Sequence, residues 1–222
     1  MPCSSLTLAE NSTPNSFENA KEGYHAVGKE VGLMPMTSTQ PEMLILVDEN
    51  DEVIGFQEKE SCHDGDGLLH RAFSVFLFDQ TGRLLLQKRS LHKRLWGDFW
   101  SNSCCSHPRP HEDTREAAEK RVREELGVDS CLHFFFKFEY RARYDGRGSE
   151  NELCHVYAGL LVGEPKVNEF EVNAWRMICP KSLDQELIEK PGAFTPWLKS
   201  EWPRLRGNHW DSIEGLLALG NG

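Results

Sequence analysis

The chain has 222 residues and a net charge of −10, from 25 Lys and Arg against 35 Asp and Glu. This length is enough for one domain with a full hydrophobic core, and 39% hydrophobic with 27% charged residues is typical of a globular protein. The acidic balance argues against nucleic acid or an anionic membrane surface as the main partner, and no apolar run is long enough to span a bilayer.

Residues 1–40 are rich in Ser, Thr, Asn and Pro and show no hydrophobic period. We therefore expect a flexible N-terminal tail, followed by a single domain over residues 41–222. The first residues lack the basic start and the apolar stretch of a secretory signal. Seven scattered cysteines favour free thiols in a reducing compartment over a disulfide framework. These features predict a cytoplasmic protein.

Strand patterns begin after the expected tail. A buried-strand run at 43–47 and a second strand at 52–56 flank an acidic turn. Residues 72–78 and 83–88 are separated by a turn that contains Gly82, which predicts a hairpin.

The clearest helix covers residues 114–126. Asp113 and Glu116 form a capping box before and within its first turn, and Gly127 follows its last turn. Apolar residues repeat every fourth position along it and give one buried stripe.

The remainder of the chain again favours strands, followed by short helices. The predicted strands are 132–143, 153–161 and 174–179, and the predicted helices are 183–188, 195–202 and 210–219. Strands outnumber helices, and one helix lies between hairpins, so we predict an α+β fold with a mixed β-sheet and flanking helices.

Five side chains have the composition of a metal site. They are His63, His70, His107, Glu150 and Glu152. The two glutamates alternate around Asn151, so in a strand they would point to the same face. Imidazole with carboxylate suits Mn²⁺ or Zn²⁺. The alternative is that the histidines are solvated loop residues and the glutamates face water.

Residues 123–128, Arg-Glu-Glu-Leu-Gly-Val, resemble the end of the Nudix box, G-x5-E-x7-R-E-U-x-E-E-x-G-U, where U is a bulky apolar residue. In that family the carboxylates of a loop and helix hold Mg²⁺ against a diphosphate. The box would begin at Ser106 in place of Gly and would place Glu112 on its first Glu. It would have Lys120 in place of Arg and Arg121 in place of Glu. Loss of the Glu at 121 argues against hydrolysis and leaves diphosphate binding.

Four strings in order resemble one branch of the Nudix fold. They are Leu-Leu-His-Arg-Ala-Phe-Ser at 68–74, Ser-Asn-Ser-Cys-Cys-Ser-His-Pro at 101–108, Glu-Asn-Glu at 150–152 and Thr-Pro-Trp at 195–197. Together they resemble type I isopentenyl-diphosphate delta-isomerase over about residues 43–202. The resemblance implies a single-domain Nudix-like architecture. It also implies an enzyme that interconverts isopentenyl diphosphate and dimethylallyl diphosphate in isoprenoid biosynthesis.

The resemblance also implies the catalytic and metal-binding residues. Cys105 and Glu152 match the essential cysteine and glutamate, Tyr140 matches a tyrosine beside that glutamate, and Trp197 matches an aromatic side chain over the reacting carbons. The implied ligands of the Mn²⁺ or Zn²⁺ site are His63, His70, His107, Glu150 and Glu152. The implied Mg²⁺ on the substrate diphosphate uses the carboxylate of Glu125 and the backbone carbonyl of Cys105. The implied basic contacts to the diphosphate are Lys59, Arg89, Lys93 and Arg121.

The isomerisation requires an acid and a base. Protonation of an alkene gives a tertiary carbocation, and a well-placed carboxyl group can supply the proton, whereas a thiolate can remove one from the neighbouring carbon. We assign protonation to Glu152 and proton removal to Cys105, and the two assignments could be exchanged. Alternatively, Cys104 and Cys105 are inert buried thiols, or Cys105 joins His107 in a structural Zn²⁺ site. Tyr140 and Trp197 could equally be core aromatics.

Three functions therefore compete. The first is the isomerase acting on a small isoprenoid diphosphate. The second is a Nudix pyrophosphohydrolase acting on a nucleoside or other diphosphate. The third is a catalytically silent binding module, which would have lost part of the site, yet all the candidate residues are present together. Oligomeric state is left open.

Overall fold

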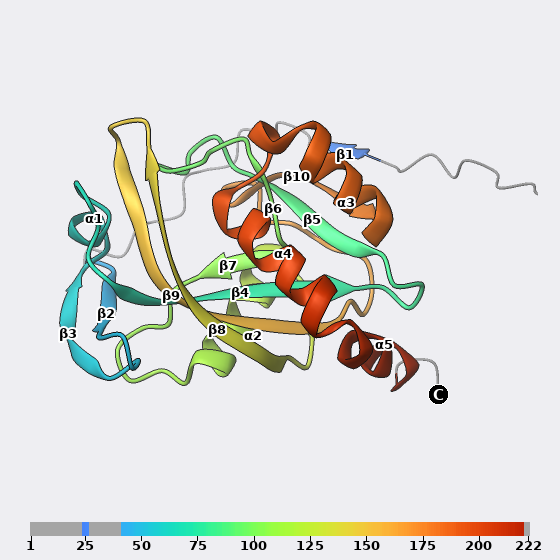
Figure 1. Ribbon diagram of the computed structural model, residues 1–222, viewed down its shortest axis with the longest axis horizontal. Helices are drawn as coiled ribbons and strands as arrows, with labels where there is room; N and C mark the ends of the chain where they lie inside the picture. The colour runs from blue at the N-terminus through green and yellow to red at the C-terminus, as the bar shows by residue number, and fades with distance from the viewer. Residues whose placement is uncertain (1–23, 27–40, 220–222) are drawn as a thin grey trace, which may run out of the picture.

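The computed structural model describes residues 24–26 and 41–219 (Figure 1). Its strands are β1 (Tyr24–Ala26), β2 (Met43–Val47), β3 (Val53–Glu58), β4 (His70–Phe78), β5 (Leu84–Arg89), β6 (Trp100–Ser101), β7 (Cys104–Ser106), β8 (His133–Tyr144), β9 (Gly148–Leu160) and β10 (Val172–Ile178). Its helices are α1 (Lys59–Cys62), α2 (Thr114–Leu126), α3 (Pro180–Glu189), the 3₁₀ helix η1 (Pro191–Ala193), α4 (Pro196–Asn208) and α5 (Trp210–Leu219).

The strands form one mixed sheet, which confirms the predicted α+β class. The main path runs β1-β10-β5-β4-β2-β3, with β9 beside β4 and β8 beside β9. Strand β9 pairs with β4 in parallel, whereas the other pairs are antiparallel. The predicted hairpin between 72–78 and 83–88 is wrong over most of its length. The two strands pair only at Phe78↔Leu84 and then separate, because β7 pairs with β4 and β6 pairs with β5 along the edges where the hairpin would continue.

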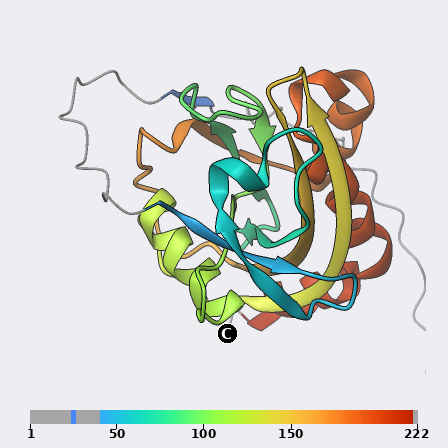
Figure 2. The same ribbon diagram turned by 90° about the vertical axis from the view of Figure 1, so that its left-hand side faces the viewer.

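Helices cover both faces of the sheet. Figure 2 shows α2 on one side and α3, α4 and α5 on the other. Strand β4 supplies both cores because successive side chains point to opposite faces. Phe73, Val75 and Leu77 pack with α2, whereas Phe76 and Phe78 pack with the C-terminal helices.

Helix α2 forms as its sequence predicts. The Asp113 carboxylate accepts hydrogen bonds from the backbone amides of Arg115 and Glu116, which satisfies amides that have no partner within the helix. Gly127 ends the helix with a left-handed φ of 65°. A Cβ at this position would lie 2.8 Å from the Lys166 carbonyl oxygen, so a larger residue would be strained.

The expected N-terminal tail lies mostly outside the described residues. Within it, Tyr24–Ala26 form β1 and pair with β10, and His25 stacks on Trp175 at 4.3 Å. The domain boundary at residue 41 therefore stays a prediction. In the described part of the chain, six cysteines are free thiols, and no helix is long and apolar enough to cross a membrane.

A buried carboxyl group, Glu201, lies between α4 and the sheet. Its side chain is completely buried, and one oxygen lies 3.5 Å from the Cys154 sulfur, which donates to it. The other oxygen has no hydrogen-bond partner in the described part of the chain. Burial raises the pKa of Glu201 to about 8, against hydrogen bonds from Ser74 and Cys154 that lower it. The folded protein therefore holds this proton at neutral pH.

We expect Glu201→Gln to stabilise the protein at alkaline pH. The pKa is raised in the folded state, so the unfolded chain releases the proton more readily, and stability is lost as pH rises from about 4.5 towards 8. The neutral amide removes this loss, which is about 4 kcal/mol at pH 8, and the difference should vanish towards pH 4.5. Urea unfolding of both proteins across this range measures it. Glu189→Gln, at an exposed position, is the control for the substitution itself. A stability difference between Glu201→Gln and the parent that does not change with pH would contradict a protonated Glu201.

Candidate active site

The five predicted metal ligands meet in one buried cluster. One ligand atom from each of His63, His70, His107, Glu150 and Glu152 lies within 4.8 Å of every other. Glu150 and Glu152 are 6% and 8% exposed, so both point inward and not to water. The alternative of solvated histidines and glutamates is therefore wrong.

Strand register brings the ligands together. His70 begins β4 and lies opposite Glu152 of β9 in the parallel pair. Glu150 shares a face with Glu152 because β9 begins at Gly148, five residues before the predicted strand, so both lie within regular strand. His63 follows α1, and His107 follows β7, which also pairs with β4.

Backbone hydrogen bonds orient two of the rings for metal binding. Nδ1 of His63 lies 2.6 Å from the Lys59 carbonyl, and Nδ1 of His70 lies 2.7 Å from the Leu68 carbonyl. A carbonyl only accepts, so each Nδ1 carries the proton and each Nε2 presents a lone pair to the cluster. Nε2 of His70 is buried without a hydrogen-bond partner in the described part of the chain. The imidazole lone pairs and the carboxylates of Glu150 and Glu152 converge on one another, which is the arrangement that a divalent cation would bind.

Glu152 is the most connected carboxylate of the cluster. Tyr140 donates a hydrogen bond of 2.6 Å to one oxygen, and Nε2 of His107 lies 3.0 Å from the other. Burial by itself raises the pKa of Glu152, but His70 and the Tyr140 hydroxyl outweigh it and the pKa is lowered. Burial and the neighbouring histidines lower the pKa of His107 well below its usual range, so this ring is neutral.

Cys105 lies beside a guanidinium group. Its sulfur accepts a hydrogen bond of 3.3 Å from Nη1 of Arg89, and both residues line a cavity of about 300 Å³ with the metal cluster. Burial raises the pKa of the Cys105 thiol to about 12, while Arg89 acts to lower it. Cys104 points to the other face and packs under α2. Only Cys105 of this pair lines the cavity.

Trp197 is held from three sides at the start of α4. Its indole nitrogen donates to Ser101 at 2.9 Å and to Asn102 at 3.0 Å. The Arg89 guanidinium lies over the ring at 4.9 Å from its centroid. The ring is 3% exposed, and it lines the cavity as Tyr140 does. Trp197 is thus both a packed residue and a wall of the cavity.

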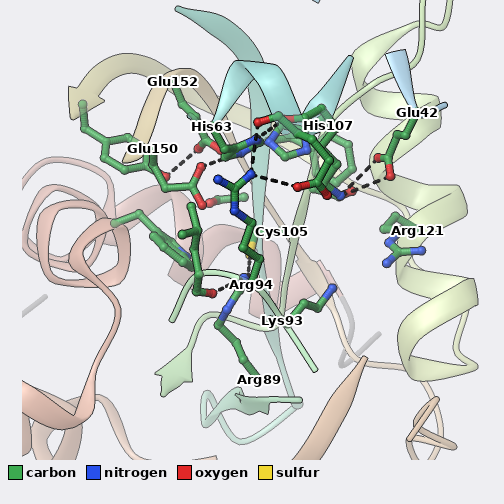
Figure 3. A pocket seen from close by; sticks show the side chains of 18 of the residues that line it. Glu42, His63, Arg89, Lys93, Arg94, Cys105, His107, Arg121, Glu150 and Glu152 are labelled. Carbon is green, nitrogen blue, oxygen red and sulfur yellow. Dashed lines mark hydrogen bonds and ion pairs between the residues drawn. The ribbon is translucent and has the colours of Figure 1, made fainter. Parts of the chain in front are cut away.

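The four predicted diphosphate cations, Lys59, Arg89, Lys93 and Arg121, all line this cavity. Figure 3 shows Arg89 and Lys93 on the opposite side of Cys105 from His107 and Glu152, with Arg121 on α2. Three of these cations also line an adjoining cavity of about 280 Å³. The two cavities share these three residues and together form one channel, lined by both basic and acidic side chains, that includes the thiol and the metal cluster.

Glu125, the predicted Mg²⁺ ligand, lies beneath these cations. It is 1% exposed and accepts hydrogen bonds from Nε of Arg121 at 2.8 Å and from Gln87 at 3.2 Å. It does not line either cavity. In this structure Arg121 covers Glu125, so the carboxylate reaches a ligand only if that side chain moves.

The sequence reasoning missed several residues at the site. Arg94 closes one side of the cavity by donating to Glu60 and to the Arg147 carbonyl. Glu42 and Glu171 pair with the predicted diphosphate cations. Arg94 was visible as the neighbour of Lys93, but neither carboxylate lies in a recognisable motif. Only the folded chain brings them to the site.

Comparison with known families and proteins agrees with this geometry. The model of the NUDIX domain matches residues 68–198. The isopentenyl-diphosphate delta-isomerase of Serratia proteamaculans is 42% identical over 177 residues, covering 80% of this chain and 98% of that protein. The isopentenyl-diphosphate delta-isomerase of Burkholderia multivorans is 45% identical over 156 residues, covering 70% and 88%.

Solved structures show the same fold at low sequence identity. The DR0079 protein of Deinococcus radiodurans gives a TM-score of 0.61 at 22% identity and covers 73% of this chain and 98% of its own. The MutT protein of Methanosarcina mazei gives a TM-score of 0.53 at 16% identity and covers 64% and 96%. At these identities the likeness shows the shared Nudix fold.

Proposed function

Because the chain belongs to the isopentenyl-diphosphate delta-isomerases of the NUDIX domain family, we propose that Glu152 adds one proton to isopentenyl diphosphate and that Cys105 removes another, which gives dimethylallyl diphosphate. The supporting observation is that the Cys105 thiol and four of the five metal-cluster residues, Glu152 among them, line a single cavity with four cations. The substrate is a small isoprenoid diphosphate. We also propose that the protein is cytoplasmic and has no nucleic-acid partner.

The proposal assigns two divalent cations to this site, and the first fits the residues as they stand. We assign Mn²⁺ or Zn²⁺ to His63, His70, His107, Glu150 and Glu152, whose buried lone pairs and carboxylates suit such an ion. Mg²⁺ would be held with the substrate diphosphate by Glu125 and the Cys105 carbonyl, which would require Arg121 to move off the Glu125 carboxylate. When bound, these cations neutralise carboxylate and diphosphate charge.

Glu152 is assigned the proton transfer to the terminal alkene carbon. Tyr140 contacts one oxygen of its carboxyl group and His107 contacts the other, and these two contacts fix the orientation of the group. Protonation leaves a tertiary carbocation in the substrate. The cavity walls must exclude water from that cation, and Trp197, Leu95 and Phe73 supply apolar surface there.

Cys105 is assigned the removal of the proton from the neighbouring carbon. In the substrate-free protein the thiol holds its proton, since burial raises its pKa. The forward reaction starts from a thiolate and a protonated Glu152 carboxyl group. The proton therefore has to leave the sulfur, and the Glu152 carboxylate, whose pKa is lowered in the substrate-free protein, has to gain one. Arg89 is the group that stabilises the thiolate. The reverse reaction exchanges the two roles.

One assay tests the function. Incubation with isopentenyl diphosphate and Mg²⁺ in D₂O, followed by proton NMR, should show deuterium entering an allylic product. Release of inorganic phosphate or pyrophosphate would instead support the Nudix pyrophosphohydrolase. Absence of both reactions would support a binding module.

Trp197 should act on the cation more than on substrate binding. An indole face stabilises a desolvated cation by about 2 kcal/mol, and a neutral alkene gains little from it. We expect Trp197→Leu to lower kcat about tenfold with a smaller change in KM, and Trp197→Phe to keep part of the rate. Steady-state kinetics with thermal unfolding measure both effects. A destabilised Leu variant with normal kcat in its folded fraction would leave Trp197 with a packing role alone.

A further inference from the structure

Three of the four cations assigned to the substrate diphosphate are paired with carboxylates in the substrate-free protein. Lys59 lies 3.2 Å from Glu42, and Lys93 and Arg121 both pair with Glu171. The site is therefore not an open basic pocket. An incoming diphosphate has to exchange with anions that belong to the protein.

Arg121 has each of its nitrogens facing a carboxylate. Nε lies 2.8 Å from Glu125, Nη1 lies 3.1 Å from Glu124 and Nη2 lies 2.6 Å from Glu171. The Glu124 side chain is 44% exposed and largely screened by solvent, whereas that of Glu171 is 21% exposed. Glu171 is thus the stronger competitor for a ligand that approaches through the channel.

Glu171 also bridges two cations. One carboxylate oxygen pairs with Lys93 and the other with Arg121, and among the described residues no other carboxylate pairs with both. Burial would raise the pKa of Glu171, but Lys93 and Arg121 lower it to about 2, so the group is charged at any physiological pH. A bridging anion between a lysine and an arginine is the arrangement that a diphosphate would adopt here.

The backbone at Glu171 is fixed, but its side chain can turn. Its carbonyl accepts from the Ser90 amide at 2.9 Å, and its own amide donates to the Asn168 carbonyl at 2.9 Å. Strand β10 begins at the next residue, Val172. Release of the two cations therefore needs only rotation of the side chain, with no movement of the strand.

We propose that Glu171 takes the place of the substrate diphosphate in the empty site and is displaced from Lys93 and Arg121 when the diphosphate binds. The inference rests on the proposed function, because that function assigns these cations to the diphosphate. Glu171 then limits affinity, and it favours anions that can bind both cations at once. Glu42 holds Lys59 and Arg109 in the same way at the other side of the channel.

Calorimetric titration with inorganic pyrophosphate in the presence of Mg²⁺ tests this. We expect Glu171→Gln to bind pyrophosphate about tenfold more tightly than the parent, a change equivalent to about 1.4 kcal/mol. The matched control is Glu124→Gln, which removes the same charge from Arg121 but touches only one of the two cations. It should change the affinity by less than about twofold.

Equal or weaker binding by Glu171→Gln would overturn the proposal and leave Glu171 as a residue that positions Lys93 and Arg121. If the Gln variant is unstable, Glu171→Asp can replace it in the titration. This variant keeps the charge, but its side chain is too short to bridge both cations. It should also bind more tightly than the parent. The binding comparison needs no turnover, whereas isomerisation by the parent in D₂O tests the proposed function separately.

Discussion

Cys105→Ser should lower kcat for isomerisation by about a thousandfold and leave the fold intact. General acid–base groups contribute about 10²- to 10⁴-fold to a rate, and a serine hydroxyl does not ionise in the range where a thiol does. The Cys105 sulfur lies in the cavity, 3.3 Å from Nη1 of Arg89. A hydroxyl there keeps the hydrogen bond but cannot act as the base. Initial rates with isopentenyl diphosphate, together with thermal unfolding, measure the effect.

The neighbouring thiol provides the control. Cys104 is completely buried against α2 and does not line the cavity. Cys104→Ser replaces a buried thiol, packed in the core beside the Glu125 carboxylate, by a more polar hydroxyl, so it should reduce thermal stability and keep kcat within about threefold of the parent. Turnover by Cys105→Ser close to that of the parent would rule out the assigned role.

Glu152→Gln should lose about a thousandfold in kcat, and Glu150→Gln about ten- to a hundredfold. Both changes remove a carboxylate from the metal cluster, and even the loss of a hydrogen-bond partner of a metal ligand typically costs 10- to 100-fold in metal affinity or activity. Glu152 alone also contacts Tyr140 and His107 and is assigned the proton transfer. Glu150 faces His63 at 2.9 Å.

Metal content and kcat have to be measured on both variants. Mass spectrometry of the purified proteins should show similar metal loss, whereas kcat at saturating metal should separate them. Equal losses of kcat at saturating metal would mean that metal binding is the shared cause, and Glu152 would lose its assigned proton transfer.

Much of the fold follows from local sequence signals. The cap at Asp113, the apolar stripe of α2 and the left-handed Gly127 depend on residues within one or two turns of each other. For the same reason the predicted strands lie within a few residues of the observed bounds, whereas the short strands β1, β6 and β7 were not predicted. Among the predicted strands, the start of β9 differs most from its predicted position. Its first residues are polar, and a polar segment is predicted as a loop when its tertiary neighbours are not known.

The residue types of the candidate site were also visible in the sequence. Histidines, alternating glutamates and the two cysteines carry the chemistry whatever their arrangement, and four ordered strings identified the family resemblance. The predicted ligands all entered the cluster. The roles of these residues stay proposals that the variants above test.

Pairings between distant segments were decided only by the tertiary structure. The parallel contact of β4 with β9, which sets His70 opposite Glu152, joins residues 82 positions apart and has no local signature. Glu171 meets Lys93 and Arg121, and Arg121 covers Glu125, for the same reason. Ion pairs between distant segments depend on where the backbone places the two side chains. The local sequence around a glutamate therefore does not indicate which cation it pairs with. The sequence alone thus determined which groups are available for chemistry, and tertiary packing decided which of them neutralise one another before a substrate arrives.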